Sequence, residues 1–105
     1  MSQSLAYLLF DFSEDTDGLG VFDAMASTLP EQFEAVQAEA EQVLVWARQH
    51  FPQGPGPIDE GHDWDVDEQI QQENSLSGEV WHTLTLSLTG TPAFCEAFGQ
   101  RFLCD

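Results

Sequence analysis

The segment Glu79–Thr89 reads EVWHTLTLSLT and decides the fold prediction. Apolar and polar residues alternate along it, which is the period of an extended chain whose side chains point to opposite faces. One face collects the aliphatic residues Val80, Leu84, Leu86 and Leu88. The other face carries Trp81 and a row of threonine and serine hydroxyls. The pattern therefore predicts a β-strand with one buried and one polar face.

The preceding segment Asp63–Glu73 (DWDVDEQIQQE) alternates in the same way. Its apolar residues are Trp64, Val66 and Ile70, and its other face carries acids and amides. We expect a second strand, joined to Glu79–Thr89 by a turn at residues 74–78. Glu68 falls on the apolar side, so we expect an edge position, a bulge or an arginine partner for it.

Two further strands are predicted before these. Ser4–Phe12 (SLAYLLFDF) is apolar on both faces, which is typical of a strand in the middle of a sheet. Ser13–Gly20 is rich in turn formers and leads into Leu19–Ser27, which we expect to pair back as a hairpin. A short helix is the alternative for Leu19–Ser27, because alanine and methionine tolerate both conformations.

A long helix is predicted over Thr28–Phe51. Thr28 and Glu31 have the spacing of a capping box, Pro30 suits the first turn, and Pro52 ends the helix. Apolar residues recur at helical spacing and form one stripe of Phe33, Val36, Ala40, Val43, Leu44, Ala47 and Phe51.

A final helix is predicted over Thr91–Leu103, beginning at Pro92. The complete order is ββαββα within a single domain, residues 1–105. We therefore expect the α+β class, with a four-stranded, mainly antiparallel sheet and both helices packed on one face.

Trp46 and Val45 lie opposite the apolar stripe of the long helix. Either the C-terminal helix covers them, or they form an exposed apolar spot. In the second case a homodimer through this face is the sharper hypothesis.

The charge excludes several classes of partner. The chain holds 2 Lys plus Arg against 19 Asp plus Glu, a formal net charge of −17, and no lysine. Direct binding of nucleic acid or of an anionic membrane needs cationic side chains, so we expect neither. A basic protein is the expected kind of partner. We expect Arg48 and Arg101 to donate internal salt bridges.

A cytoplasmic location is the expectation. Met1–Ser4 lacks the positive charge of a signal peptide, and no apolar run approaches the roughly 20 residues that span a bilayer. Cys95 and Cys104 do not form a disulfide framework, which favours a reducing compartment.

The acids suggest a mimic of nucleic acid. On a strand, Asp63, Asp65 and Asp67 would repeat about every 6.8 Å and form a regular line of negative charge. Such a line resembles the phosphates that a DNA-binding groove recognises. The candidate contact residues are Asp63, Asp65, Asp67, Glu73, Asp15, Asp17, Trp46 and Trp81. The alternative is a solvated face that only keeps the protein soluble.

Motifs for catalysis are weak. His62 lies among acids in Asp59–Asp67, which makes a small enzyme or ligand-binding domain an alternative function. The loop Ser13–Ala24 partly matches a calcium-binding loop but lacks its first and last acids, so weak divalent-cation binding is a further alternative. No zinc, nucleophile or phosphate-loop motif is present. Enzyme activity is therefore the less favoured hypothesis, and we expect no cofactor or bound metal.

Overall fold

The computed structural model describes residues 7–103, without the side chain of Leu103, and has the predicted α+β order. The strands are β1 (Asp11–Glu14), β2 (Gly20–Thr28), β3 (Trp64–Asn74) and β4 (Val80–Gly90). The helices are α1 (Pro30–His50) and α2 (Pro92–Phe98), with a 3₁₀ turn η1 (Ile58–Glu60) and a π-helical turn η2 (Gly99–Leu103). The strands predicted from Leu19–Ser27, Asp63–Glu73 and Glu79–Thr89 are confirmed to within one residue at each end.

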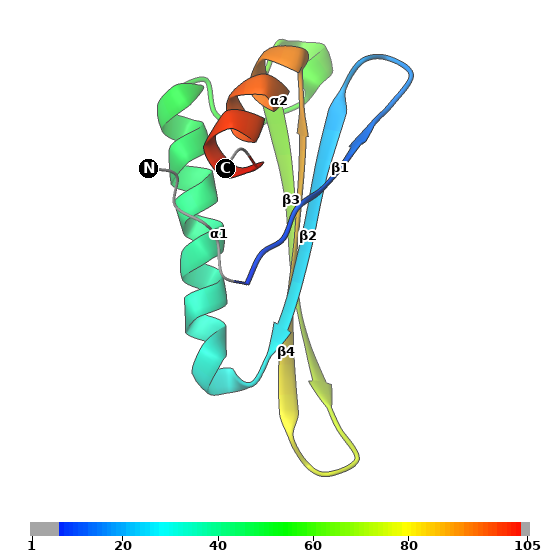
Figure 1. The fold of residues 1–105 in the computed structure, drawn as a ribbon, viewed down its shortest axis with the longest axis vertical. Helices are drawn as coiled ribbons and strands as arrows, with labels where there is room; N and C mark the ends of the chain where they lie inside the picture. Colours follow the sequence, from blue (N-terminus) through cyan, green and yellow to red (C-terminus); the bar gives the residue numbers. More distant parts are fainter. Residues whose placement is uncertain (1–6, 104–105) are drawn as a thin grey trace.

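The four strands form one antiparallel sheet in the order β1-β2-β4-β3. Two hairpins, β1–β2 and β3–β4, lie side by side, and β2 joins them by pairing with β4. The helix α1 connects β2 to β3 across β4 (Figure 1). β3 is thus an edge strand, and its Glu68 is exposed, which confirms the edge position expected for this carboxylate.

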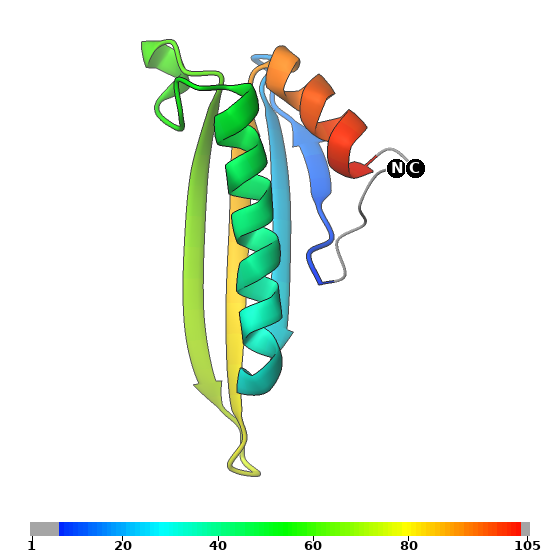
Figure 2. The ribbon, with the colours of Figure 1, turned by 90° about the vertical axis from the view of Figure 1, so that its left-hand side faces the viewer.

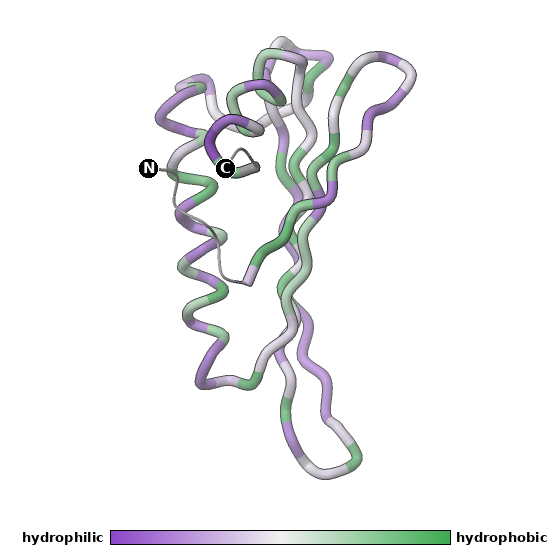
Figure 3. The backbone as a smooth tube through the Cα atoms, in the orientation of Figure 1, coloured by the Kyte–Doolittle hydropathy of each residue, from purple (hydrophilic) through white to green (hydrophobic). Residues whose placement is uncertain are grey.

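Both helices cover the same face of the sheet, as predicted (Figures 1 and 2). α1 packs along β4 and β2, and α2 packs across the end of the sheet. The strand residues beneath them are buried: Phe22, Ala24, Ala26, Leu84, Leu86 and Leu88. Figure 3 shows hydrophilic and hydrophobic residues alternating along α1, as expected for a helix with one buried stripe. Every residue of the predicted stripe from Phe33 to Ala47 is buried.

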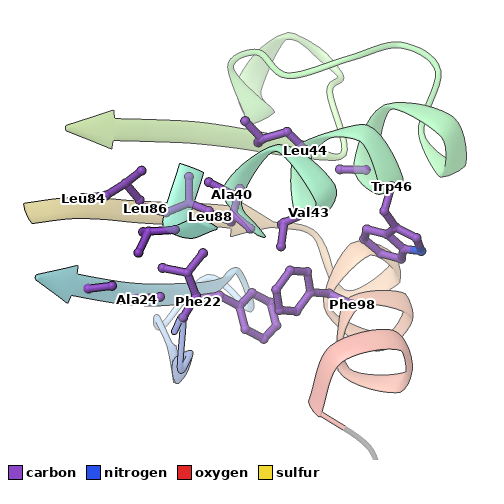
Figure 4. Close-up of a cluster of buried hydrophobic side chains, with 14 of the residues drawn as sticks. Phe22, Ala24, Ala40, Val43, Leu44, Trp46, Leu84, Leu86, Leu88 and Phe98 are labelled. Atoms are coloured by element: carbon purple, nitrogen blue, oxygen red, sulfur yellow. The ribbon is translucent and has the colours of Figure 1, made fainter. Parts of the chain in front are cut away.

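Aromatic rings fill the space where α1 and α2 meet the sheet. Phe98 lies with its ring centre 4.2 Å from Phe22 and 5.9 Å from Trp46 (Figure 4). Trp64 stacks on Phe94 at 5.8 Å, with the ring planes 9° apart. Such pairs add to the free energy gained from burying their apolar area. Trp46 is only 7% exposed and lies against Phe94 and Phe98, so the alternative in which the C-terminal helix covers it is confirmed. Its other candidate role, as an exposed contact or dimer residue, is corrected.

The first strand differs from the prediction. Ser4–Ala6 lie outside the described residues, and the strand starts only at Asp11, at an edge of the sheet rather than in its middle. The backbone N–H groups of Tyr7 and Leu8 donate to the Glu39 carboxylate on α1, at 2.9 and 3.0 Å. A side chain of the helix layer therefore takes the place of a neighbouring strand, and Leu8 is buried.

The start of α1 also differs from the predicted capping box. Thr28 is the last residue of β2, paired with His82, and its buried Oγ1 has no hydrogen-bond partner. Leu29 occupies the N-cap without a side-chain cap, and Pro30 begins the helix as predicted. Because Thr28 remains in the ladder of the sheet, its hydroxyl does not reach the first turn.

None of the helices within residues 7–103 is both long enough and apolar enough to cross a lipid bilayer.

Candidate functional site: the open face of the sheet

Among residues 7–103, no helix covers the face of the sheet opposite α1 and α2 (Figure 1). Side chains alternate along each strand, so this open face is built from the residues between those of the core. One row runs across all four strands, because the register places Asp11 opposite Asp23, Asp23 opposite Ser87, and Ser87 opposite Asp67. Neighbouring strands lie about 4.8 Å apart, so three carboxylates share a short strip of surface.

Hydrogen bonds between strands hold the hydroxyls of this face in place. Ser87 Oγ donates to Asp23 Oδ1 at 2.5 Å, and Ser27 Oγ lies 2.8 Å from Thr83 Oγ1. Within β3, the side-chain amide Gln69 Nε2 donates to Asp67 Oδ2 at 3.4 Å. The hydroxyls of β4 are half-buried, whereas Asp11, Asp23 and Asp67 are exposed. The three carboxylates are therefore more exposed to solvent than the uncharged serine and threonine side chains of β4 between them.

Four of the candidate contact residues lie on the open face. Asp65 and Asp67 lie on β3, and Asp65 Oδ1 accepts the N–H of Val66 at 2.9 Å. Glu73 and Trp81 pair across β3 and β4 near the turn of that hairpin. Glu73 is exposed and Trp81 is half-buried.

Asp63 does not continue the line as a free carboxylate. It precedes β3, is half-buried, and its Oδ1 accepts a hydrogen bond from Thr91 Oγ1 at 3.3 Å. Its backbone carbonyl accepts the N–H of Thr91 at 3.0 Å. Asp63 thus ties the start of β3 to the N-cap of α2.

Asp15 and Asp17 lie in the turn between β1 and β2, at the opposite end of the sheet from Glu73. Asp15 Oδ1 accepts the N–H groups of Asp17 and Leu19, each at 2.9 Å. This carboxylate shapes the turn. No group of three His, Cys, Asp or Glu residues within residues 7–103 is placed to hold a metal ion.

Sequence reasoning missed Asp11 and Asp23. They line a shallow hollow of about 360 Å³ on the open face, together with Leu9, Met25 and Thr85. Leu9 is 77% exposed and Met25 is 66% exposed, so apolar surface adjoins the two carboxylates. The alternation within β2 carried a signal for Asp23, but the pairing with Asp11 depends on where β1 begins.

His62 has a structural environment. Its Nδ1 donates to the backbone carbonyl of Gly54 at 3.1 Å, and the ring is half-buried against Gly56. A Cβ at Gly56 would lie 2.6 Å from His62 Nε2, so the glycine permits this close contact. The geometry orders the loop that leads to β3.

Cys95 is a free thiol beside Gly90 and Gly20. Burial raises its pKa above the ordinary thiol value, and the nearby Glu14 carboxylate acts in the same direction, against a hydrogen bond from the Gly20 backbone. A protonated thiol is a poor nucleophile, so the raised pKa lowers the reactivity of this residue.

Comparison with protein-family models, with curated proteins and with solved structures finds no significant match to this chain. The function is therefore argued from the geometry of the chain itself.

Proposed function

We propose that the protein is a non-enzymatic binding module that takes a basic protein on the open face of its sheet. The observation that carries this proposal is the row Asp11–Asp23–Ser87–Asp67, which crosses four strands on a face that neither of the described helices covers. A surface of one sign attracts and orients a partner of the opposite sign.

The distribution of the two cations supports the proposal. Arg48 lies on α1 and Arg101 on η2, so both belong to the helix layer. The chain has no lysine, and hence no cationic side chain neutralises the carboxylates of the open face. A partner bearing lysine and arginine would supply that charge.

Hydroxyls and apolar side chains complete the proposed contact surface. The half-buried hydroxyls of β4 offer hydrogen bonds, and the exposed Leu9 and Met25 offer apolar contact for the aliphatic stems of lysine or arginine. Trp81 adds a half-buried aromatic ring near the far end. The proposal includes a reducing compartment such as the cytoplasm, in keeping with the free Cys95 thiol.

Mimicry of nucleic acid is the specific form of the proposal in which the partner is itself a DNA- or RNA-binding protein. A competition experiment separates mimicry from general binding of basic proteins. If the partner is held by mimicry, duplex DNA that fills the partner's DNA-binding groove releases it from this protein, in proportion to the fraction of grooves filled. A partner that binds duplex DNA and this protein at the same time would contradict mimicry and leave the basic-protein proposal standing.

The test compares two triple variants that remove equal charge. One carries Asp11→Asn, Asp23→Asn and Asp67→Asn on the open face. The other carries Glu31→Gln, Glu34→Gln and Glu41→Gln on the exposed side of α1. Calorimetry with octalysine at low salt should give at least about tenfold weaker binding for the open-face variant, at roughly 0.5 kcal/mol for each charge. Equal weakening in both variants would mean that only net charge matters, and would overturn the proposal.

A further inference from the structure

A second hollow lies in the helix layer, away from the open face. It has a volume of about 250 Å³ between the end of α1 and the α2–η2 segment, and is lined by Trp46, His50, Ala97, Gln100 and Arg101. The rings of Trp46 and His50 stack at 4.8 Å, with 30° between their planes. His50 Nδ1 donates to the Trp46 carbonyl at 3.0 Å, which fixes the ring. The hollow thus has an aromatic wall.

Arg101 is unusual in this setting. Its guanidinium carbon lies 4.7 Å above the centre of the Phe102 ring, and its Nη1 is buried with no hydrogen-bond partner. Among residues 7–103 no carboxylate forms an ion pair with it, although the chain has 19 acids. Within residues 7–103, Arg101 therefore does not form the internal salt bridge expected for it. Leaving a charged donor buried and unpaired is costly, and the cation–π contact does not satisfy its N–H groups.

We propose that this hollow binds a small organic carboxylate. A guanidinium presents parallel N–H donors that match the two oxygens of a carboxylate, and Arg101 would supply them. The Gln100 amide offers a further donor at the rim, and Trp46 with Ala97 provides apolar wall for the body of the ligand. The volume is at the small end for ligand sites, which fits a ligand with a single ring.

The net charge of the protein sharpens the choice of ligand. A charge of −17 repels anions at long range, so charge recognition must be local. An organic carboxylate gains contact with Trp46 in addition to the guanidinium. Inorganic phosphate carries more negative charge and no apolar body, so it should bind more weakly than the carboxylate.

The test uses phenylacetate as the probe and benzylamine as a control of matched shape and opposite charge. We expect phenylacetate to give saturable amide and indole NMR shifts at Trp46 and Arg101, with a dissociation constant below about 10 mM, and to bind more tightly than inorganic phosphate. Benzylamine should bind at least about tenfold more weakly. Because this comparison uses the unaltered protein, it is decisive even if a variant fails to fold.

Two variants locate the charge. Arg101→Gln should weaken phenylacetate binding by roughly tenfold or more, whereas Arg48→Gln makes the same change of charge on the exposed side of α1 and should leave binding unchanged. Arg101→Lys keeps the positive charge but lacks the paired N–H donors of the guanidinium, so it should give an intermediate loss of phenylacetate affinity. Equal binding of the two probes, equal weakening by the two glutamine variants, or no saturable shift at Trp46 would each overturn the proposal.

Discussion

The two faces of the sheet differ more than any two segments of the chain. On β4, Leu86 is fully buried beneath the helices, while its neighbour Thr85 lies on the open face. Both residues share one strand and one hydrogen-bond ladder, so the difference comes only from what covers each face. The side chains of the covered face therefore contribute most of the free energy of unfolding. Under our proposal, binding belongs to the open one, where charge is tolerated because water reaches it.

Substitutions at two neighbouring residues of β4 test this difference between the two faces most directly. Leu86→Ala should lower the free energy of unfolding by about 2–5 kcal/mol, because it leaves a cavity in the core. Thr85→Ala should change it by less than about 0.5 kcal/mol. Urea unfolding measures both values. Losses of similar size in the two variants would contradict the assignment of stability to the covered face.

On the covered side of the sheet, Glu39 of α1 holds the N-terminal segment by hydrogen bonds to its backbone. Glu39→Gln should lower the free energy of unfolding by about 1–2 kcal/mol, because its carboxylate accepts the N–H groups of Tyr7 and Leu8. Hydrogen exchange at those two amides should become faster. The exposed Glu41 on the same helix provides the control, and an equal loss in Glu41→Gln would attribute the effect to charge alone.

Like charges oppose each other on the open face. Asp11 and Asp23 are directly paired across β1 and β2, so Asp11→Asn should raise the free energy of unfolding by roughly 0.2–1 kcal/mol at low salt. The gain should shrink in high salt, where the repulsion is screened. Thermal unfolding at two ionic strengths measures it. A loss of stability would mean that Asp11 makes a favourable contact.

Cys95, which is half-buried on α2, tests the comparison through the reactivity of its thiol. In a Cys104→Ser background, its reaction with a disulfide reagent should be slower than that of an unstructured thiol, because burial raises its pKa and shields the sulfur. Any stability that follows from the raised pKa is fully present below the ordinary thiol pKa and is lost as the pH rises through the folded value. A rate equal to that of the unstructured thiol would place the sulfur in solvent.

Patterns within single segments predicted most of the fold. The alternation in Glu79–Thr89 and the stripe from Phe33 to Ala47 each report a buried face, and the structure has both. The N-terminal prediction failed because apolar composition does not reveal which backbone N–H groups donate hydrogen bonds to a neighbouring strand. The backbone N–H groups of Tyr7 and Leu8 donate to the Glu39 carboxylate instead.

The candidate site was less accessible to sequence reasoning. Asp65 and Asp67 were predicted from the period of one strand. The row that joins Asp67 to Asp23 and Asp11 depends on the strand order, because β2 pairs with β4 across the connection made by α1. That order is a property of long-range packing, and no local pattern encodes it.

The most direct test of the open face as a binding surface is an amide NMR titration of the unaltered protein with octalysine at low salt. Our account predicts shifts concentrated on β1–β4, centred on Asp11, Asp23 and Asp67, and lost at high salt. Shifts of equal size along the acidic outer side of α1, which also carries exposed glutamates, would contradict it.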